Sequence, residues 1–77
     1  MQYSHHLLRN LRSTIGRNIH TLRAERSMLL SELAASAKVS ETMLDRYEIG
    51  KHAILLHELL RIACALQVDA WKLLVQN

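Results

Sequence analysis

The sequence lacks proline, has only two glycines (Gly16 and Gly50), and contains one cysteine, Cys64, among 77 residues. Without proline or glycine-rich stretches, no segment is typical of a linker, so one compact domain is the simplest organisation. A single cysteine excludes an intrachain disulfide and a cysteine-rich zinc site, and it fits a reducing cytoplasm. No apolar run approaches the roughly 18 residues of a membrane span and the N-terminus lacks a signal-peptide core, so we expect a cytoplasmic protein with no membrane partner.

The formal net charge of +3 is unevenly distributed. Residues 1–26 carry five arginines against one glutamate, residues 27–50 carry two basic against four acidic residues, and residues 51–77 carry three basic against two acidic residues. Nucleic-acid binding draws mainly on Lys and Arg, so the basic N-terminal third favours it and the acidic middle opposes it. With 49% hydrophobic residues in so short a chain, a single core is marginally stable and dimerisation is a reasonable source of further burial.

Apolar residues recur at three- and four-residue steps from about His5 to about Arg26, as on one face of a helix. They are Leu7, Leu8, Leu11, Ile15, Ile19 and Leu22. Gly16 interrupts this run at a cost of roughly 1 kcal/mol relative to alanine, and Ser13 and Thr14 are suitable helix N-caps. We therefore expect the main helix to begin close to Thr14, after a turn or short helix that holds the first leucines.

A helix-turn-helix is predicted over about residues 30–49. Its first helix runs from about Leu30 to Ala37, and its second from Glu41 to Ile49. Ser40 can cap the second helix by accepting from a free backbone amide. Gly50 can take the left-handed conformation that ends a helix without steric cost.

Beyond Gly50, an amphipathic stripe predicts a fourth helix, and Asp69 can cap a short fifth helix. The stripe consists of Leu56, Leu59, Leu60, Ala63 and Leu66, and the fifth helix carries Trp71, Leu73 and Leu74. Period-two alternation is absent over any useful length, so we expect an all-α fold of five helices. We divide it into an N-terminal extension over residues 1–13 and a helix-turn-helix domain over residues 14–77.

A set of residues between Ile15 and about Leu74 follows a recognisable order. It comprises Ile19, Leu22, Arg23, Glu32, Leu33, Ala34, Val39, Ser40, Leu44, Tyr47, Glu48, Gly50, Lys51, Leu59, Ile62, Ala63, Ala65, Leu66, Val68 and Leu73. In this order and spacing the chain resembles the Cro/repressor-type (XRE-like) helix-turn-helix domains of phage repressors, restriction-modification controller proteins and some antitoxins. The resemblance implies a lambda-repressor-like fold and a regulator that binds double-stranded DNA as a homodimer, without a cofactor.

The resemblance also implies roles for single residues. An arginine at the position of Arg23 pairs in the family with a glutamate at that of Glu48, and we predict this pair as a structural tie. Family contacts to DNA phosphates would fall on Lys38, Ser40, Lys51 and His52, and contacts to base edges on Glu41, Thr42, Asp45 and Arg46. The last helix commonly forms a twofold dimer contact, which would involve Trp71, Leu74 and Val75 while they also help to close the core.

The chemistry of the predicted base-reading residues leaves alternatives open. Arg46 can bind guanine in bidentate fashion, Thr42 can contact a thymine methyl, and Glu41 can accept from cytosine N4. Alternatively, Glu41 contributes only a favourable charge at the positive N-terminus of its helix. Asp45 either reads a base or is solvated or paired with Arg46 or Lys38.

The chain departs from the family pattern at four positions. Leu29 and Leu30 replace a polar cap and a glutamine that normally anchors a phosphate, so that contact is missing. Lys38 replaces the usual glycine of the turn, and Ile54 replaces a proline after the third helix. The surplus apolar residues are either buried or form a partner-binding patch; they are Met28, Leu29, Leu30, Ile54 and Leu55.

Other kinds of site are not predicted. The five histidines, His5, His6, His20, His52 and His57, lack the helical pairing with a third ligand that zinc requires, so we expect no metal. Cys64 has no catalytic context and should be a small packing residue. The acidic residues are not arranged around an obvious cleft, so an enzyme is not expected.

Two functions therefore compete. One is a sequence-specific transcriptional regulator, in which the third helices of a homodimer enter successive major grooves of an inverted repeat about 34 Å apart. The other is a helix-turn-helix scaffold with weak or lost DNA binding that binds a protein partner, as an antirepressor, antitoxin-like or assembly module. The acidic residues of the third helix favour the second function, and Ser40, Thr42, Arg46 and Lys51 favour the first.

Overall fold

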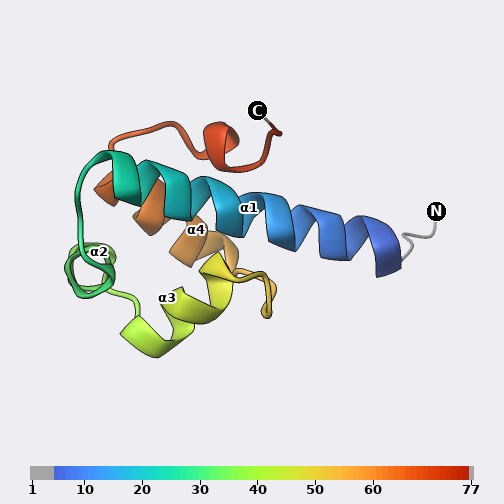
Figure 1. The fold of residues 1–77 in the computed structure, drawn as a ribbon, viewed down its shortest axis with the longest axis horizontal. Helices are drawn as coiled ribbons and strands as arrows, with labels where there is room; N and C mark the ends of the chain where they lie inside the picture. Colours follow the sequence, from blue (N-terminus) through green and yellow to red (C-terminus); the bar gives the residue numbers. More distant parts are fainter. Residues whose placement is uncertain (1–4, 77) are drawn as a thin grey trace.

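A computed structural model describes residues 5–76, with side chains from residue 8 onward, and this part contains four α-helices, one 3-10 helix and no strand (Figure 1). The elements are α1 (His5–Glu25), α2 (Leu30–Ala37), α3 (Glu41–Glu48), α4 (Leu56–Ala65) and η1 (Ala70–Leu73). The expected all-α fold is confirmed, although the fifth helix is a 3-10 helix. Residues 1–4 of the predicted extension, residue 77 of the predicted domain, and the side chains of His5, His6 and Leu7 lie outside the described residues.

The break predicted near Thr14 is wrong, because α1 is one continuous helix of 21 residues. Thr14 is buried within it instead of capping its start. Gly16 marks a close crossing with the end of α3: a Cβ there would lie 2.3 Å from the Tyr47 carbonyl oxygen and 2.5 Å from that of Glu48. Glycine is required at this point by tertiary packing rather than by a helix end.

The core begins at Ile15 of α1 and includes residues from every other helix. Its fully buried large side chains are Ile19, Leu33, Leu44, Ile62, Leu66 and Leu73. α1 packs on α3 and η1, and α2 packs on α3 and α4. The N-terminal half of α1 therefore extends beyond the packed body (Figure 1), and the predicted core face is wrong for Leu8 and Leu11, which are 47% and 43% exposed.

The fourth helix and the C-terminal segment also differ in detail from expectation. Leu56 and Leu60 of the predicted stripe are 70% and 51% exposed. Its other members, Leu59, Ala63 and Leu66, are buried, together with Ile62, which the stripe does not include. Asp69 precedes η1 but its side chain makes no capping hydrogen bond. No helix in the described part of the chain is long and apolar enough to cross a membrane.

Candidate nucleic-acid interface

α3 presents one polar face to solvent. Leu44 and Tyr47 are buried and Met43 is half-buried, whereas the four residues predicted to face DNA bases are all exposed; these are Glu41, Thr42, Asp45 and Arg46. Residues four apart stack along one side of a helix, so Glu41 with Asp45 and Thr42 with Arg46 form two adjacent rows. The exposed face therefore mixes one guanidinium and one hydroxyl with two carboxylates.

The beginning of α3 is set by Ser40. Its Oγ accepts a hydrogen bond of 3.0 Å from the Met43 backbone amide, which confirms the predicted N-cap. Ser40 itself is exposed at the helix N-terminus, where backbone amides and the helix dipole attract anions. Glu41 in the first turn competes with such an anion for the same positive potential.

The turn between α2 and α3 contains a left-handed residue that is not glycine. Lys38 has φ 58° and ψ 44°, and its backbone amide closes the end of α2 on Ala34 and Ala35. Arg61 of α4 supports the turn from the other side: its Nε donates to the Ala37 carbonyl at 3.0 Å and its Nη2 to the Lys38 carbonyl at 3.3 Å. The Lys38 side chain remains exposed beside Ser40.

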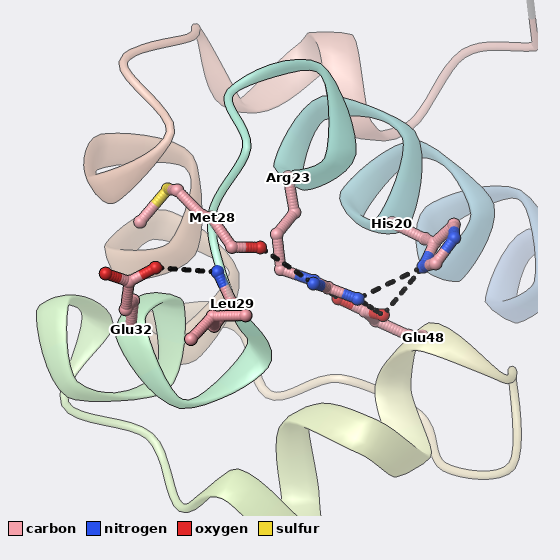
Figure 2. A network of polar contacts seen from close by, with 6 residues as sticks. All are labelled: His20, Arg23, Met28, Leu29, Glu32 and Glu48. Atoms are coloured by element: carbon pink, nitrogen blue, oxygen red, sulfur yellow. Dashed lines mark hydrogen bonds and ion pairs between the residues drawn. The ribbon is translucent and has the colours of Figure 1, made fainter.

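The end of α3 is tied to α1 by a polar network (Figure 2). Arg23 Nε donates to Glu48 Oε2 at 2.7 Å, and Arg23 Nη2 donates to Oε1 at 3.0 Å. Arg23 Nη1 also donates to the Met28 carbonyl at 2.9 Å, so the same guanidinium holds the α1–α2 loop. His20 Nδ1 lies 3.1 Å from Glu48 Oε1. The structure thus brings together the two residues of the predicted pair and adds His20 to them.

Electrostatics in this network favour the ionised pair. The Glu48 side chain is only 6% exposed, and burial alone would raise its pKa. The hydrogen bonds and charges of Arg23 and His20 outweigh that effect, so the pKa of Glu48 lies below its ordinary value. The hydrogen bond to Glu48 correspondingly raises the pKa of Arg23.

A second network joins α3 to α4 through buried Tyr47. Its hydroxyl donates to Glu58, and Glu58 in turn lies 3.7 Å from Nη2 of Arg61. Burial, followed by this hydrogen bond, raises the pKa of Tyr47 to about 12. Since Arg61 also binds the carbonyls of the turn, the orientation of α3 relative to α2 depends on α4.

The loop after α3 folds back on that helix. Gly50 has φ 76°, as predicted for the residue that ends the helix, and the Lys51 amide donates to the Arg46 carbonyl at 3.0 Å. This hydrogen bond places Lys51 beside the C-terminal end of the exposed face. The side chains of Lys51 and His52 are both exposed, as phosphate contacts would require.

The surplus apolar residues are divided between core and surface. Met28, Leu30 and Ile54 are partly buried against the core, whereas Leu29 and Leu55 are 64% and 55% exposed. Leu29 replaces the polar cap that the family has before α2. Glu32 compensates in part for the missing cap, because its Oε1 accepts from the Leu29 amide at 2.8 Å. This is half of a capping box, since leucine has no side-chain acceptor.

The three residues predicted for a dimer contact lie on the surface near the C-terminus. Trp71, Leu74 and Val75 are 57%, 42% and 39% exposed, and buried Leu73 closes the core between them. Asn18 of α1 fixes this segment by donating from its side-chain amide to the carbonyls of Leu73 at 3.0 Å and Val75 at 2.8 Å.

Sequence reasoning missed three supporting residues, Asn18, His20 and Arg61. Asn18 and His20 lie within the helical pattern of α1 and Arg61 within that of α4, so no local pattern distinguishes them. The partners through which they tie different elements together are 23 to 57 residues away in the chain. Among residues 5–76, no group of His, Cys, Asp and Glu could hold a metal ion.

Comparisons with known proteins agree with this geometry. Residues 19–70, more than half of the chain, match the family model HTH_3, described as helix-turn-helix. The clp gene regulator ClgR from C. glutamicum is 28% identical, with a TM-score of 0.79 over 83% of this chain and 82% of that one. An HTH_3 family transcriptional regulator from Vibrio cholerae is 26% identical, with a TM-score of 0.81 over 86% of this chain and 37% of that one.

A more distant structure shows the same fold. The restriction-modification controller protein C.AhdI from Aeromonas hydrophila is 21% identical, with a TM-score of 0.78 over 80% of this chain and 94% of that one. A search of curated proteins gave no match to the sequence.

Proposed function

The chain belongs to the helix-turn-helix family HTH_3, a family of DNA-binding transcription regulators rather than enzymes, and we propose that it binds a specific DNA sequence as a homodimer. Its operator would be an inverted repeat with half-sites about 34 Å apart, one for each α3. Regulation would be steric, since a protein bound over a promoter blocks polymerase, or in some positions recruits it.

The observation that carries this proposal is the presentation of α3. Its buried side is fixed by Leu44 and Tyr47, its end is tied to α1 by Glu48, and the residues of its outward face are all exposed. A rigidly held helix with a free polar face suits insertion into a major groove. We assign Arg46, Thr42, Glu41 and Asp45 to base edges.

Phosphate contacts are assigned to the residues that flank this face. Lys38 and Ser40 lie before α3, and Lys51 and His52 follow it. Together they would position the helix in the groove without reading sequence. The glutamine anchor usual in the family is replaced by Leu30, so we expect affinity to depend more heavily on these four residues.

We assign the dimer contact to the exposed C-terminal apolar residues Trp71, Leu74 and Val75. A twofold axis there would bury each tryptophan against the partner, as interface centres commonly do. Asn18 keeps the segment rigid through its bonds to the carbonyls of Leu73 and Val75, so little ordering would be needed on association.

The test is DNA binding by the purified chain, first to a random pool for selection and then to the selected site by fluorescence anisotropy. The dissociation constant should rise steeply between about 50 and about 200 mM salt. Arg46→Ala should lose about 1–3 kcal/mol of affinity for the selected site. Arg26→Ala, which removes an exposed arginine on the turn after α1, is the matched control and should retain binding.

A protein-binding scaffold is the second candidate, and the charge on α3 favours it. Glu41 and Asp45 are exposed and form no ion pair with other described residues, so both carboxylates would meet DNA uncompensated. Exposed Leu29 and Leu55 would then contact the partner. Absence of any DNA binding at about 50 mM salt, together with no effect of Arg46→Ala in vivo, would support this candidate instead.

A further inference from the structure

The projecting half of α1 forms one wall of an apolar groove that the DNA-binding proposal does not use. Leu8, Leu11 and Ile15 line it from α1, and Ala53 and Ile54 line it from the loop between α3 and α4. In Figure 1 the N-terminal end of α1 extends past the other helices. The volume is about 420 Å³, within the range of roughly 300–1000 Å³ that is usual for ligand pockets.

Two arginines line the same groove, Arg9 and Arg12. No carboxylate of the described residues forms an ion pair with either one. Residues 8–24 of α1 and residues 49–57 around the loop contain no aspartate or glutamate. The groove thus combines apolar walls with positive charge that is not neutralised locally.

Arg12 adds an unsatisfied hydrogen-bond donor. Its Nε is buried and has no hydrogen-bond partner among the described residues. A buried donor without an acceptor costs free energy, and the penalty is larger when the group is charged. Arg12 as a whole is only partly buried, so a carboxylate in the groove can approach its guanidinium, and a small shift of the side chain would bring Nε within reach of that acceptor.

Charge argues against two other occupants. A second copy of this chain docked here about a twofold axis would set Arg9 and Arg12 against the same arginines of the partner, which is repulsive. DNA would satisfy the arginines, but the phosphate backbone offers nothing apolar to cover Leu8 and Leu11, which are about half exposed. The surface requires apolar and acidic groups in one ligand.

We propose that this groove docks an amphipathic acidic helix of a partner protein. Its apolar side chains, spaced at i, i+3, i+4 and i+7, would lie along Leu8, Leu11 and Ile54, and a carboxylate would meet the Arg12 guanidinium. This is the helix-in-groove mode of recognition. None of the residues that line the groove belongs to α3, and the inference does not depend on DNA binding.

The test uses three synthetic helical peptides of roughly 15 residues, about four turns. One carries leucines at i, i+3, i+4 and i+7 with glutamates around them; the second has lysines in place of the glutamates; the third has serines in place of the leucines. Each is titrated, without DNA, against the full chain by fluorescence anisotropy, and the site is located by amide chemical-shift changes. We expect the glutamate–leucine peptide to bind with a dissociation constant on the order of 10–100 µM and to shift Leu8, Leu11 and Ile54.

Charge-reversal variants identify the arginines. Arg12→Glu should weaken binding of the acidic peptide at least tenfold, and Arg9→Glu with Arg12→Glu should gain binding of the lysine peptide. Arg17→Glu makes the same charge change on α1 beside a different pocket and should leave the affinity unchanged. Thermal unfolding followed by circular dichroism checks that each variant is folded.

Four results would overturn the proposal. The first is no binding of the acidic peptide up to about 1 mM, and the second is equal binding of the serine peptide, which would mean that charge attraction alone holds the peptide. The third is that the chemical-shift changes are confined to α3. The fourth is dissociation of the homodimer by Leu11→Ser, which would assign the groove to a second copy of the chain. Loss of DNA binding by Arg12→Glu without any peptide binding would equally assign the arginines to phosphate.

Discussion

Arg23 and Glu48, which lie 25 residues apart in the chain, form a bidentate ion pair with N–O distances of 2.7 and 3.0 Å (Figure 2). The pair joins the last turn of α1 to the last residue of α3. Because α3 is the helix assigned to the DNA groove, its angle to the rest of the domain depends on this contact. Arg23 also holds the Met28 carbonyl, so one side chain fixes both the α1–α2 loop and α3.

Truncating either partner should destabilise the fold strongly. The Glu48 side chain is only 6% exposed, and Arg23→Ala removes the main counter-charge of its carboxylate. Breaking a buried pair costs about 3–5 kcal/mol, and we expect the lower end because Arg23 keeps 16% exposure. The measurement is urea unfolding. Arg26→Ala, an exposed arginine on the turn after α1, is the control and should change stability by less than about 0.5 kcal/mol. An Arg23→Ala midpoint equal to that of the parent would contradict a role in stability.

The same pair predicts an acid dependence of stability. The pKa of Glu48 is lower in the folded chain than its ordinary value of 4.5, so its contribution is present above that pH and is lost as pH falls through the folded pKa. The stability difference between the parent and Glu48→Gln should therefore shrink between about pH 5 and about pH 3. Urea midpoints across this range measure it, with Glu25→Gln as the control for loss of one carboxylate. A difference that stays constant with pH would show that the charge of Glu48 is not involved.

Tyr47 predicts a loss of stability at alkaline pH. Its pKa is raised to about 12 in the folded chain from an ordinary value of 10.0, so the stabilisation it gives is complete below pH 10 and is lost as pH rises toward 12. Tyr47→Phe should lower stability at neutral pH and then lose less stability than the parent above pH 10. Urea midpoints at about pH 8 and about pH 11 test this. Equal alkaline losses in the two proteins would exclude Tyr47 as the group responsible.

Gly16→Ala should destabilise, although the same change in an isolated helix gains about 1 kcal/mol. The new Cβ would lie 2.3 Å from the Tyr47 carbonyl oxygen, which is backbone and cannot rotate away. Forced separation of α1 and α3 should cost about 1–3 kcal/mol, as overpacking does. Thermal unfolding compares it with Arg17→Ala at the next, exposed position, which should be near neutral. A stabilised Gly16→Ala would mean that the helices do not cross this closely.

This glycine shows where sequence reasoning about the fold reaches its limit. Helical periodicity predicts α2, α3 and α4. The boundaries of α3 also carry local signals, with the N-cap Ser40 at its start and the left-handed Gly50 after its end. Gly16 carries the same local signal as a helix break, and only the proximity of α3 shows that it is a packing requirement. Local propensity therefore predicted a break where tertiary contact maintains one helix.

The candidate site divides in the same way. The family resemblance predicts which residues of α3 face DNA, and the structure places those four residues on the exposed side, with Leu44 and Tyr47 on the buried side. Arg23 and Glu48 came from the family resemblance, because no local pattern joins residues 25 positions apart. Arg61, which supports the turn through the carbonyls of Ala37 and Lys38, had no sequence signal, because a side-chain bond to a distant backbone leaves no periodic pattern.

Two substitutions of Lys38 separate the effect of its backbone strain on stability from the effect of its charge on DNA affinity. Its left-handed conformation, with φ 58°, costs a non-glycine residue about 1 kcal/mol, so Lys38→Gly should raise stability, by up to that amount. Lys38→Ala keeps the strain and should leave stability nearly unchanged. Both variants remove one positive charge, and if Lys38 contacts phosphate, both should lower DNA affinity to the same extent and reduce the salt slope by about one. Unequal DNA affinities would mean that turn geometry, not charge, controls binding.

Glu41→Gln distinguishes the two interpretations of the acidic face. If Glu41 serves only the helix N-terminus, the change should cost about 0.3–1 kcal/mol of stability and increase affinity for every DNA sequence, because a repulsive charge is removed. If Glu41 accepts from cytosine N4, affinity should fall by about 1–3 kcal/mol for the selected site and rise for sites that lack that cytosine. Anisotropy with the selected site and with the same site carrying a cytosine-to-thymine change measures the two affinities. Glu25→Gln, which removes an exposed carboxylate from α1 instead of α3, is the control. If Glu41→Gln raises the affinity for both DNA sites, Glu41 is excluded as a base-reading residue. If it lowers the affinity for the selected site and raises the affinity for the thymine-containing site, Glu41 is established as one.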